Sequence, residues 1–272
     1  MKVALYTIET LSNLHAGSGD INFGVIDNEV QRDPVSELPV INSSSLKGAF
    51  REAFDIDGSK ALTEYIFGPD NDSNDSHRTG AYSFFEAQLL SRPVRSNVKA
   101  WFSATSPSAI GSFLDMLEDF DIEIDEQAKR QLDELRRLSP AQGRPMIFEA
   151  IPNAILEDME TVTNTLDLSA AKSFLGSDIA LFNDEDFKKL DLPVIARNSL
   201  DNGVSVNLWY EEVVPKKSRF FFCIGKPENI AEADAKKIEG LSNRFDDETQ
   251  IVQFGANKSI GYGFCKVTKV SR

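Results

Sequence analysis

The chain has 272 residues, of which 41% are hydrophobic, so it is long enough to bury a full core and is not expected to be disordered. Its 29 basic and 43 acidic residues give a formal net charge of −14, whereas nucleic-acid-binding proteins usually carry a positive surface. The longest apolar run, 220–224, is too short to span a bilayer, and no apolar leader is recognisable; both features predict a cytoplasmic protein.

The charges are unevenly distributed along the chain. Segments 87–114, 213–227 and 249–272 contain basic residues and no acid. The acids instead concentrate in 115–134 and 228–248, which read as helices with solvated outer faces. A negative total is therefore compatible with one positive face.

Hydrophobic periodicity predicts an alternation of strands and helices. Strands are expected, in chain order, at 3–10, 23–30, 81–90, 98–105, 193–200, 204–210, 218–225, 251–254 and 262–270. Helices are expected from a serine N-cap at 43–45 through residue 54, and at 107–118, 126–138 and 230–241. The polar tract 68–76 has nothing to bury and is expected to be a surface loop. This order favours an α+β core of ferredoxin-like type.

Two further features concern single elements. The tripeptide Asp201-Asn-Gly203 tolerates positive φ and predicts a tight hairpin between 193–200 and 204–210. Cys223 and Cys265, the only cysteines, both lie in apolar strand-like runs. Buried free thiols are expected there, rather than a disulfide, a metal site or a nucleophile.

A carboxylate stands out in the N-terminal part, where Asp27 follows a short apolar run in a glycine-bounded loop. A lone carboxylate can hold a divalent ion or orient a nucleophile if other oxygens complete the site. The alternative is that Asp27-Asn28 only makes a turn. His15, beside Gly17, is interpreted as a locally bonded turn residue or as a general base, and His77 as a surface residue.

Basic residues follow on the next helix. Lys47 and Arg51 share one face, and the helix begins beside the glycine turns, where an N-terminus favours phosphate. An ordinary solvated helix face is the alternative. The aromatic residues Trp209, Tyr210 and Tyr262 could stack on bases, although strand aromatics are usually core.

The loop 255–263 contains three glycines around Lys258. Glycine lets backbone N–H groups approach an anion, and the lysine adds charge. A plain glycine hairpin is the alternative, because the loop matches neither the Rossmann nor the Walker A pattern. Glu211 and Glu212 are interpreted as structural rather than catalytic.

Several blocks of sequence resemble a known family, the RAMP proteins of CRISPR systems, and within it the repeated backbone subunit of the type III-B, Cmr-type, RNA-guided complex. The blocks occur in the same order along nearly the whole chain. They are Leu14-His-Ala-Gly-Ser-Gly19, Gly24-Val-Ile-Asp-Asn-Glu-Val-Gln-Arg32, Ser44-Ser-Leu-Lys-Gly-Ala-Phe-Arg51, Gly80-Ala-Tyr-Ser-Phe-Phe-Glu86, Leu89-Leu-Ser-Arg-Pro-Val-Arg-Ser96, Leu208-Trp-Tyr-Glu-Glu-Val-Val-Pro215 and the loop 255–263.

The resemblance implies a single RAMP-type domain over 1–272, with a ferredoxin-like, RRM-related palm. It also implies an inserted helical segment near 106–145 and a protruding β-hairpin thumb near 192–211. The expected partners are guide RNA, single-stranded target RNA, further copies of the chain in a filament and other subunits of a Cmr-type complex, with no membrane.

The resemblance also assigns roles to residues. Asp27 is the expected catalytic residue of a target-RNA endoribonuclease, and it helps to hold a divalent ion, Mg²⁺ or Mn²⁺. The expected RNA-binding residues are His15, Ser44, Ser45, Lys47, Arg51, Arg92, Arg95, Arg197, Gly255, Asn257, Lys258, Gly261, Tyr262 and Gly263. The alternatives are a non-catalytic RNA-binding scaffold of the same complex and a small-molecule enzyme that uses the glycine loop for a nucleotide phosphate.

Overall fold

The computed structural model of the protein describes residues 1–19, 24–55, 60–69, 79–228 and 249–270. The central element within these ranges is one large mixed sheet, in which neighbouring strands run in the order β14-β15-β1-β13-β4-β5-β10-β6-β9. Its longest strands are β1 (Lys2–Thr10), β4 (Ala87–Val94), β13 (Arg219–Lys226) and β15 (Phe264–Lys269). The short strands β2 (Val40–Ile41) and β3 (Ser83–Phe84) pair with β4 and β13.

The middle of this sheet has the ferredoxin-like order. Strands β15, β1, β13 and β4 are neighbours, and every adjacent pair is antiparallel. In chain order these are the fourth, first, third and second long strands, with helix α1 (Ser43–Asp55) between β1 and β4. This arrangement confirms the predicted α+β class. The helix predicted at 230–241, between the third and fourth long strands, lies outside the described residues.

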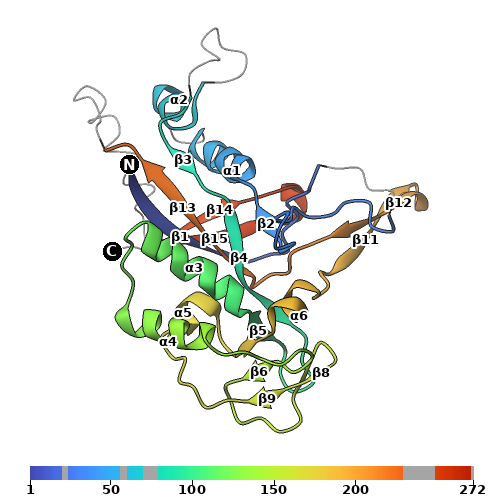
Figure 1. The fold of residues 1–272 in the computed structure, drawn as a ribbon. Helices are drawn as coiled ribbons and strands as arrows, with labels where there is room; N and C mark the ends of the chain where they lie inside the picture. Colours follow the sequence, from blue (N-terminus) through green and yellow to red (C-terminus); the bar gives the residue numbers. More distant parts are fainter. Residues whose placement is uncertain (20–23, 56–59, 70–78, 229–248, 271–272) are drawn as a thin grey trace.

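The two faces of the sheet carry different helices because side chains alternate along each strand. On β13, Phe220 and Phe222 face the core under α1, whereas Phe221 and Cys223 face the core under helix α3 (Pro107–Asp119). Figure 1 shows α1 and α2 (Lys60–Phe67) on one side, and α3, α4 (Glu126–Arg136) and α5 (Lys172–Leu175) on the other. The sheet is thus covered on both faces.

Helix α1 forms where the sequence places apolar residues on one face. Leu46, Phe50 and Phe54 are all buried, and the Phe50 ring lies 5.8 Å from the ring of Phe222 and 5.9 Å from that of Phe84. The helix begins at Ser43, so the three serines occupy its first turn instead of preceding it as caps. The predicted extent and buried face of this helix are confirmed.

Other predicted boundaries were wrong in part. The described part of the predicted strand 23–30 forms only isolated bridges, because it crosses the root of a hairpin instead of joining a sheet. The strand predicted at 81–90 is divided into β3 and β4, and the one at 98–105 begins only at Phe102, as β5 (Phe102–Thr105). Of the loop predicted at 68–76, residues 70–76 lie outside the described ranges.

Beyond β4 the sheet continues through strands of which only β5 was predicted, within the range 98–105. Strand β5 pairs with β4, and β10 (Ile179–Leu181) pairs in parallel with β5. β6 (Met146–Ile147) and β9 (Val162–Thr163) complete this side, with the small hairpin β7 (Ile155–Leu156) and β8 (Met159–Glu160) and helix α6 (Asp184–Lys188) beside it. Strands β6 to β10 are only two or three residues long, too short to leave a period-2 pattern.

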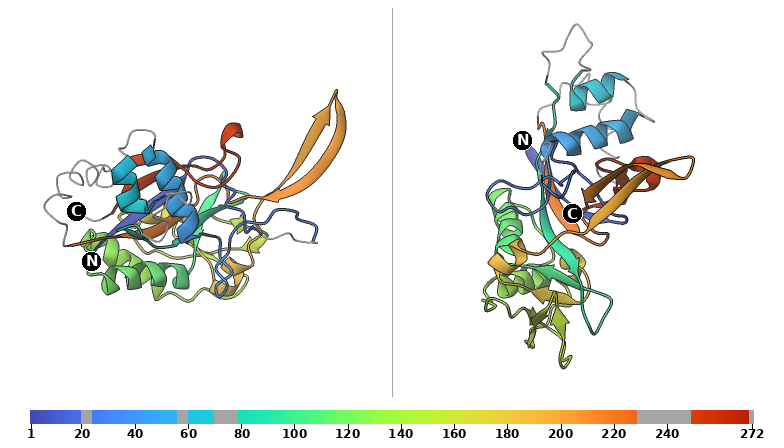
Figure 2. Two further views of the ribbon diagram at one scale, coloured as in Figure 1. Left: turned by 90° about the horizontal axis from the view of Figure 1, so that it is seen from above. Right: turned by 90° about the vertical axis from the view of Figure 1, so that its right-hand side faces the viewer.

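The predicted hairpin is confirmed and protrudes from the body (Figure 2). Strand β11 (Val194–Asp201) pairs with β12 (Val204–Glu212), and Gly203 takes a φ of 84° at the reversal. Leu200 and Leu208 remain 63% and 54% exposed, so the outer half of the hairpin shows apolar side chains to its surroundings. A surface of this kind indicates a binding element.

Candidate nucleic-acid interface

The face of the sheet that an RRM uses for stacking bases is closed in this protein. The Phe113 ring of α3 packs edge-on against Phe221 at 5.2 Å, and Leu5 and Leu90 are buried in the same layer. RNA cannot stack on covered strand residues. The candidates for a nucleic-acid interface are therefore the loops at one end of the sheet and the β11–β12 hairpin.

Asp27 lies at the root of that hairpin. Its Oδ2 accepts a hydrogen bond from the Tyr210 backbone N–H at 2.7 Å, and its own N–H donates to the Tyr210 carbonyl at 3.1 Å. The side chain is exposed, and the second oxygen, Oδ1, has no hydrogen bond to any described residue. The structure thus fixes this carboxylate in place and leaves one oxygen available.

Glu212 also holds the loop that carries Asp27. Its carboxylate accepts hydrogen bonds from the Val30 N–H at 3.1 Å and from Arg32 Nη2 at 2.5 Å. Its backbone N–H donates to the Asn28 carbonyl at 2.9 Å, and its carbonyl oxygen lies 2.7 Å from His15 Nδ1. Every polar group of Glu212 is therefore bonded to the N-terminal segment.

Glu211 joins three segments that are distant in sequence. It is 4% exposed, and its Oε1 accepts a hydrogen bond from Asn257 Nδ2 at 2.7 Å. The same oxygen lies 3.8 Å from His15 Nε2, and Oε2 lies 3.4 Å from Arg197 Nη1. A buried carboxylate needs such partners, because an unpaired charge in the interior is costly. The structural interpretation of Glu211 and Glu212 agrees with these contacts.

The C-terminal loop, residues 254–263, connects the antiparallel strands β14 (Thr249–Gln253) and β15 and contains a 3₁₀ turn at Lys258–Ile260. Gly255, Gly261 and Gly263 all have positive φ, and a Cβ on Gly263 would lie 1.8 Å from the Phe254 carbonyl oxygen. Several loop N–H groups already bond to protein carbonyls, for example that of Gly263 to Asn13. The glycines thus have a conformational role whether or not the loop meets a phosphate.

Side chains of this loop reach both neighbouring elements. The Arg197 guanidinium of the hairpin lies over the Tyr262 ring, 5.5 Å from its centroid. Lys258 Nζ pairs with Glu52 of α1 at 2.5 Å. The fold therefore brings the hairpin, the glycine loop and α1 together, as the resemblance requires.

The residues of α1 form the other border of this area. Ser44 is exposed, and Lys47 is half-buried and has no ion pair with any described residue. The Ser45 hydroxyl accepts a hydrogen bond from Gln31 Nε2 at 3.0 Å, and Arg51 Nη1 donates to the Gly68 carbonyl at 2.8 Å. Lys47 is the α1 cation best placed for a phosphate, whereas the Arg51 contact anchors α1 to the end of α2.

Two predicted RNA-binding arginines lie elsewhere. Arg92 is 5% exposed, and its guanidinium donates to the carbonyls of Leu190 and Asp191 at 2.9 and 2.5 Å. Burial lowers the pKa of Arg92 to about 10. Arg95 is exposed, and its Nε and Nη2 both donate to Oε2 of Glu157. Because Arg92 is committed to the protein's own backbone, we exclude it from the interface.

A divalent ion fits this area only if the protein and the RNA both supply its ligands. No group of three or more His, Cys, Asp or Glu side chains that could hold a metal occurs in the described part of the chain. Mg²⁺ is commonly bound by one or two carboxylates, with waters and substrate phosphates completing the octahedron. Asp27 Oδ1 can supply one such oxygen, so the donor set fits an ion that RNA phosphates help to bind.

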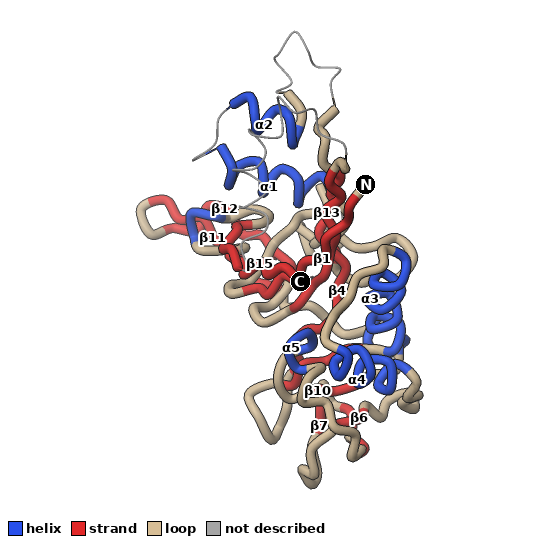
Figure 3. The backbone as a smooth tube through the Cα atoms, turned by 90° about the vertical axis from the view of Figure 1, so that its left-hand side faces the viewer, coloured by secondary structure: helices blue, strands red, loops and turns tan. Residues whose placement is uncertain are grey.

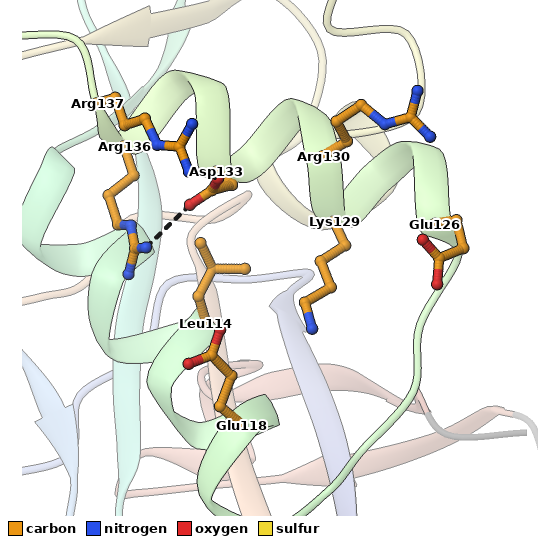
Figure 4. Close-up of a pocket in the computed structure, with 8 residues that line it drawn as sticks. All are labelled: Leu114, Glu118, Glu126, Lys129, Arg130, Asp133, Arg136 and Arg137. Atoms are coloured by element: carbon orange, nitrogen blue, oxygen red, sulfur yellow. Dashed lines mark hydrogen bonds and ion pairs between the residues drawn. The ribbon is translucent and has the colours of Figure 1, made fainter.

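One hollow on another part of the described surface shows different chemistry. The cleft between α3 and α4 has a volume of about 350 Å³ and mixes cations with acids (Figure 4). In this cleft Asp133 forms ion pairs with Arg136 and Arg137 at 2.9 and 2.5 Å, so these charges largely neutralise each other. This cleft also lies on the side of the sheet away from α1 (Figure 3).

Sequence reasoning missed two residues that organise the site. Gln31 bonds to the Gly17 carbonyl, the Ser45 hydroxyl and the Asn42 N–H, and Arg32 pairs with Glu212. Both lie in the Gly24–Arg32 block that was noted for Asp27. Their only sequence signal was polar character directly after the apolar Val30, which does not reveal partners that are distant along the chain.

Comparisons with known proteins agree on one family. The family model described as the RAMP superfamily matches residues 7–266. The CRISPR system Cmr endoribonuclease Cmr4 of Pyrococcus furiosus is 27% identical and aligns over 98% of this chain and 96% of its own length.

Solved structures show the same fold. A chain of the type III-B Cmr-beta complex bound to cognate target RNA superposes with a TM-score of 0.76 at 21% identity, covering 99% of this chain and 98% of that chain. Oligomeric Cmr4 from Pyrococcus furiosus gives a TM-score of 0.71 at 22% identity, covering 100% and 99%. Within the described ranges, no helix is long and apolar enough to cross a membrane.

Proposed function

Because this chain belongs to the RAMP superfamily, we propose that it is the repeated backbone subunit of a Cmr-type, RNA-guided CRISPR complex and that it cleaves complementary target RNA. Its partners are guide RNA, target RNA, further copies of itself and the other subunits of the complex, and its place is the cytoplasm. The observation that supports cleavage is the exposed Asp27 carboxylate, held at the root of the protruding hairpin by the Tyr210 backbone.

Guide binding is assigned to the border of α1 and the glycine loop. Lys47 and Ser44 are accessible on the first turns of α1, and Lys258 and Tyr262 lie on the neighbouring loop. Hydrogen bonds from Arg, Lys, Ser and backbone N–H groups to phosphate fix register without reading sequence. With a net charge of −14, a single copy binds RNA weakly. Several copies along one guide raise the affinity by effective concentration.

The hairpin is suited to separating nucleotides. Its outer half exposes Leu200, Val204, Val206 and Leu208, and Arg197 is the one cation among residues 194–212. Apolar side chains inserted between bases unstack them. A nucleotide displaced by the hairpin would lie beside its root, where Asp27 is held.

The proposed reaction is attack of a target 2′-hydroxyl on the adjacent phosphate. The new 2′-O–P bond forms as the bond from phosphorus to the 5′-oxygen breaks. The 2′-hydroxyl gives its proton to water and the departing 5′-oxygen takes a proton from water, which leaves a 2′,3′-cyclic phosphate and a 5′-hydroxyl. Asp27 would orient the hydroxyl through its free oxygen and provide the protein ligand for a divalent ion, Mg²⁺ or Mn²⁺. When bound, such an ion stabilises charge on the phosphoryl oxygens. Strand distortion by the hairpin supplies in-line geometry.

The experiment is single-turnover cleavage of target RNA by the reconstituted complex, with and without divalent ion, comparing wild type with Asp27→Ala and Asp27→Asn. We expect both variants to assemble with guide and to cleave slower by about 10²- to 10⁴-fold. Asp27→Asn keeps an acceptor for the Tyr210 N–H, so its failure identifies the charge as the requirement.

Asp119→Ala, at the exposed end of α3, is the control and should cleave like wild type. If the assembled Asp27 variants cut at an unchanged rate, Asp27 is not the catalytic residue, and the non-catalytic scaffold becomes the favoured alternative. RNA of uniform length that copurifies with the protein would argue against a small-molecule enzyme.

A further inference from the structure

We propose that Gln31 and Arg32 are positioning residues that hold the Asp27 loop between helix α1 and the root of the β11–β12 hairpin. Their side chains fasten the same short segment to two different elements, so the guide-binding helix and the cleaving carboxylate keep a fixed separation. The inference rests on the proposed function and deepens it.

Arg32 acts through Glu212. Its Nη2 bonds Glu212 Oε1 at 2.5 Å, and its Nη1 donates to the Glu37 carbonyl at 3.1 Å. The Glu212 side chain is 6% exposed, whereas that of Arg32 is 33% exposed. Removing one partner of a buried pair leaves the other charge uncompensated. Since Glu212 also holds Val30 and Asn28, loss of Arg32 would loosen the segment that carries Asp27.

Gln31 fastens the segment in another direction. Its Nε2 donates to the Gly17 carbonyl at 3.1 Å and to the Ser45 hydroxyl at 3.0 Å, and its Oε1 accepts the Asn42 N–H at 2.8 Å. Ser45 lies in the first turn of α1, and Asn42 directly precedes that helix. The backbone N–H of Gln31 also donates to the Ala16 carbonyl at 2.7 Å. Gln31 therefore links the glycine turn, α1 and the Asp27 loop.

The Asp27 side chain has one hydrogen bond to the described part of the chain, which it accepts from the Tyr210 N–H. Regular sheet pairing does not support this segment, because residues 24–32 form only isolated bridges. The position of the carboxylate thus depends on a few backbone hydrogen bonds to Tyr210 and Glu212 and on the side-chain bonds of residues 31 and 32. A displacement of about 1 Å at a reacting group can slow a reaction by about 10²-fold.

The test measures single-turnover cleavage and target affinity in the reconstituted complex for Arg32→Gln, Arg32→Lys and Gln31→Met. We expect Arg32→Gln and Gln31→Met to cleave about 10- to 100-fold slower at saturating target, with guide content and target Kd unchanged. Arg32→Lys, which restores the charge, should recover to within about a few fold of wild type. Hydrogen exchange of the peptide covering 24–32 should be faster in both slow variants.

Arg136→Gln is the matched control, because Arg136 is 34% exposed and pairs with acids (Figure 4). Its helix, α4, lies on the side of the sheet away from α1 (Figure 3). It should leave cleavage and exchange of 24–32 unchanged. If Arg32→Gln fails to assemble, Gln31→Met decides, since it keeps the Arg32–Glu212 pair.

The possible failures can be told apart. If Asp27→Ala is inactive while Arg32→Gln and Gln31→Met cleave normally, the positioning role is wrong and the proposed function stands. If Asp27→Ala cleaves normally, the proposed function fails, and with it the positioning of a catalytic group. Equal slowing by Arg136→Gln would also overturn the inference, because the effect would then be general.

Discussion

Alanine at Gly255 and at Gly261 separates backbone strain from a steric clash. Both glycines have positive φ, 73° and 85°. A Cβ at 255 would lie 2.2 Å from the His15 carbonyl oxygen, whereas a Cβ at 261 would have no heavy atom within 4 Å. Each alanine costs about 1–3 kcal/mol for the left-handed conformation alone. Gly261→Ala therefore measures the cost of the left-handed conformation without a steric clash.

The additional cost at Gly255 follows from its contacts. To reach ordinary contact of about 3.4 Å, the His15 carbonyl must shift by roughly 1 Å. That shift breaks its hydrogen bond from the Ala256 N–H at 2.9 Å and disturbs the 2.7 Å contact between His15 Nδ1 and the Glu212 carbonyl. At about 1 kcal/mol per bond, Gly255→Ala should lose about 2 kcal/mol more than Gly261→Ala.

Urea unfolding of the purified subunit measures this difference, and thermal scans give a second value. For a chain of this size, about 2 kcal/mol corresponds to a Tm lower by about 4–8 °C than that of Gly261→Ala. Equal stability of the two variants would refute the reasoning, since it would mean that the His15 carbonyl moves at no cost.

Two further outcomes follow from burial. Cys223 and Cys265 are fully buried, and burial raises the pKa of each thiol to about 12. We therefore expect no reaction with Ellman's reagent at pH 8 until urea is added. Rapid labelling of the folded protein would contradict this prediction. Because the folded pKa lies above the unfolded value of 9.0, their contribution to stability is complete below about pH 9 and is lost as the pH rises towards 12. Arg92→Met removes charge-assisted hydrogen bonds to the Leu190 and Asp191 carbonyls. The stability lost with these bonds is partly offset, because the variant no longer buries a cation. The variant should lower the free energy of unfolding by about 1–3 kcal/mol and leave the affinity of the folded protein for guide RNA unchanged. A lower affinity at unchanged stability would show that Arg92 belongs to the RNA interface.

The acidity of the chain is compatible with the proposed interface because charges are sorted by element. Acids of α4 pair with its own arginines, and Glu9 pairs with Lys217 and Arg219. Lys47 is not part of these pairs and lies on α1, the helix whose Glu52 pairs with Lys258 of the glycine loop. Net charge therefore limits the affinity of one copy more than it limits the chemistry at the hairpin root.

The sequence alone determined the elements whose signal is local. Apolar spacing identified α1 through Leu46, Phe50 and Phe54, and Asp201-Asn-Gly203 identified the hairpin, because both signals involve residues within a few positions of one another. The strand order of the palm followed from the succession of these elements. Motif resemblance then selected Asp27 as the candidate acid, on residue types alone.

Only the tertiary structure decided how these parts are used. It buried Arg92 against chain backbone nearly a hundred residues away, and it placed Glu211 between His15, Arg197 and Asn257. Such partners are separated by long stretches of chain, and no periodicity encodes which side chain meets which. The bonds of Gln31 and Arg32 are of the same kind, because a polar side chain acquires its partner only when distant segments pack together.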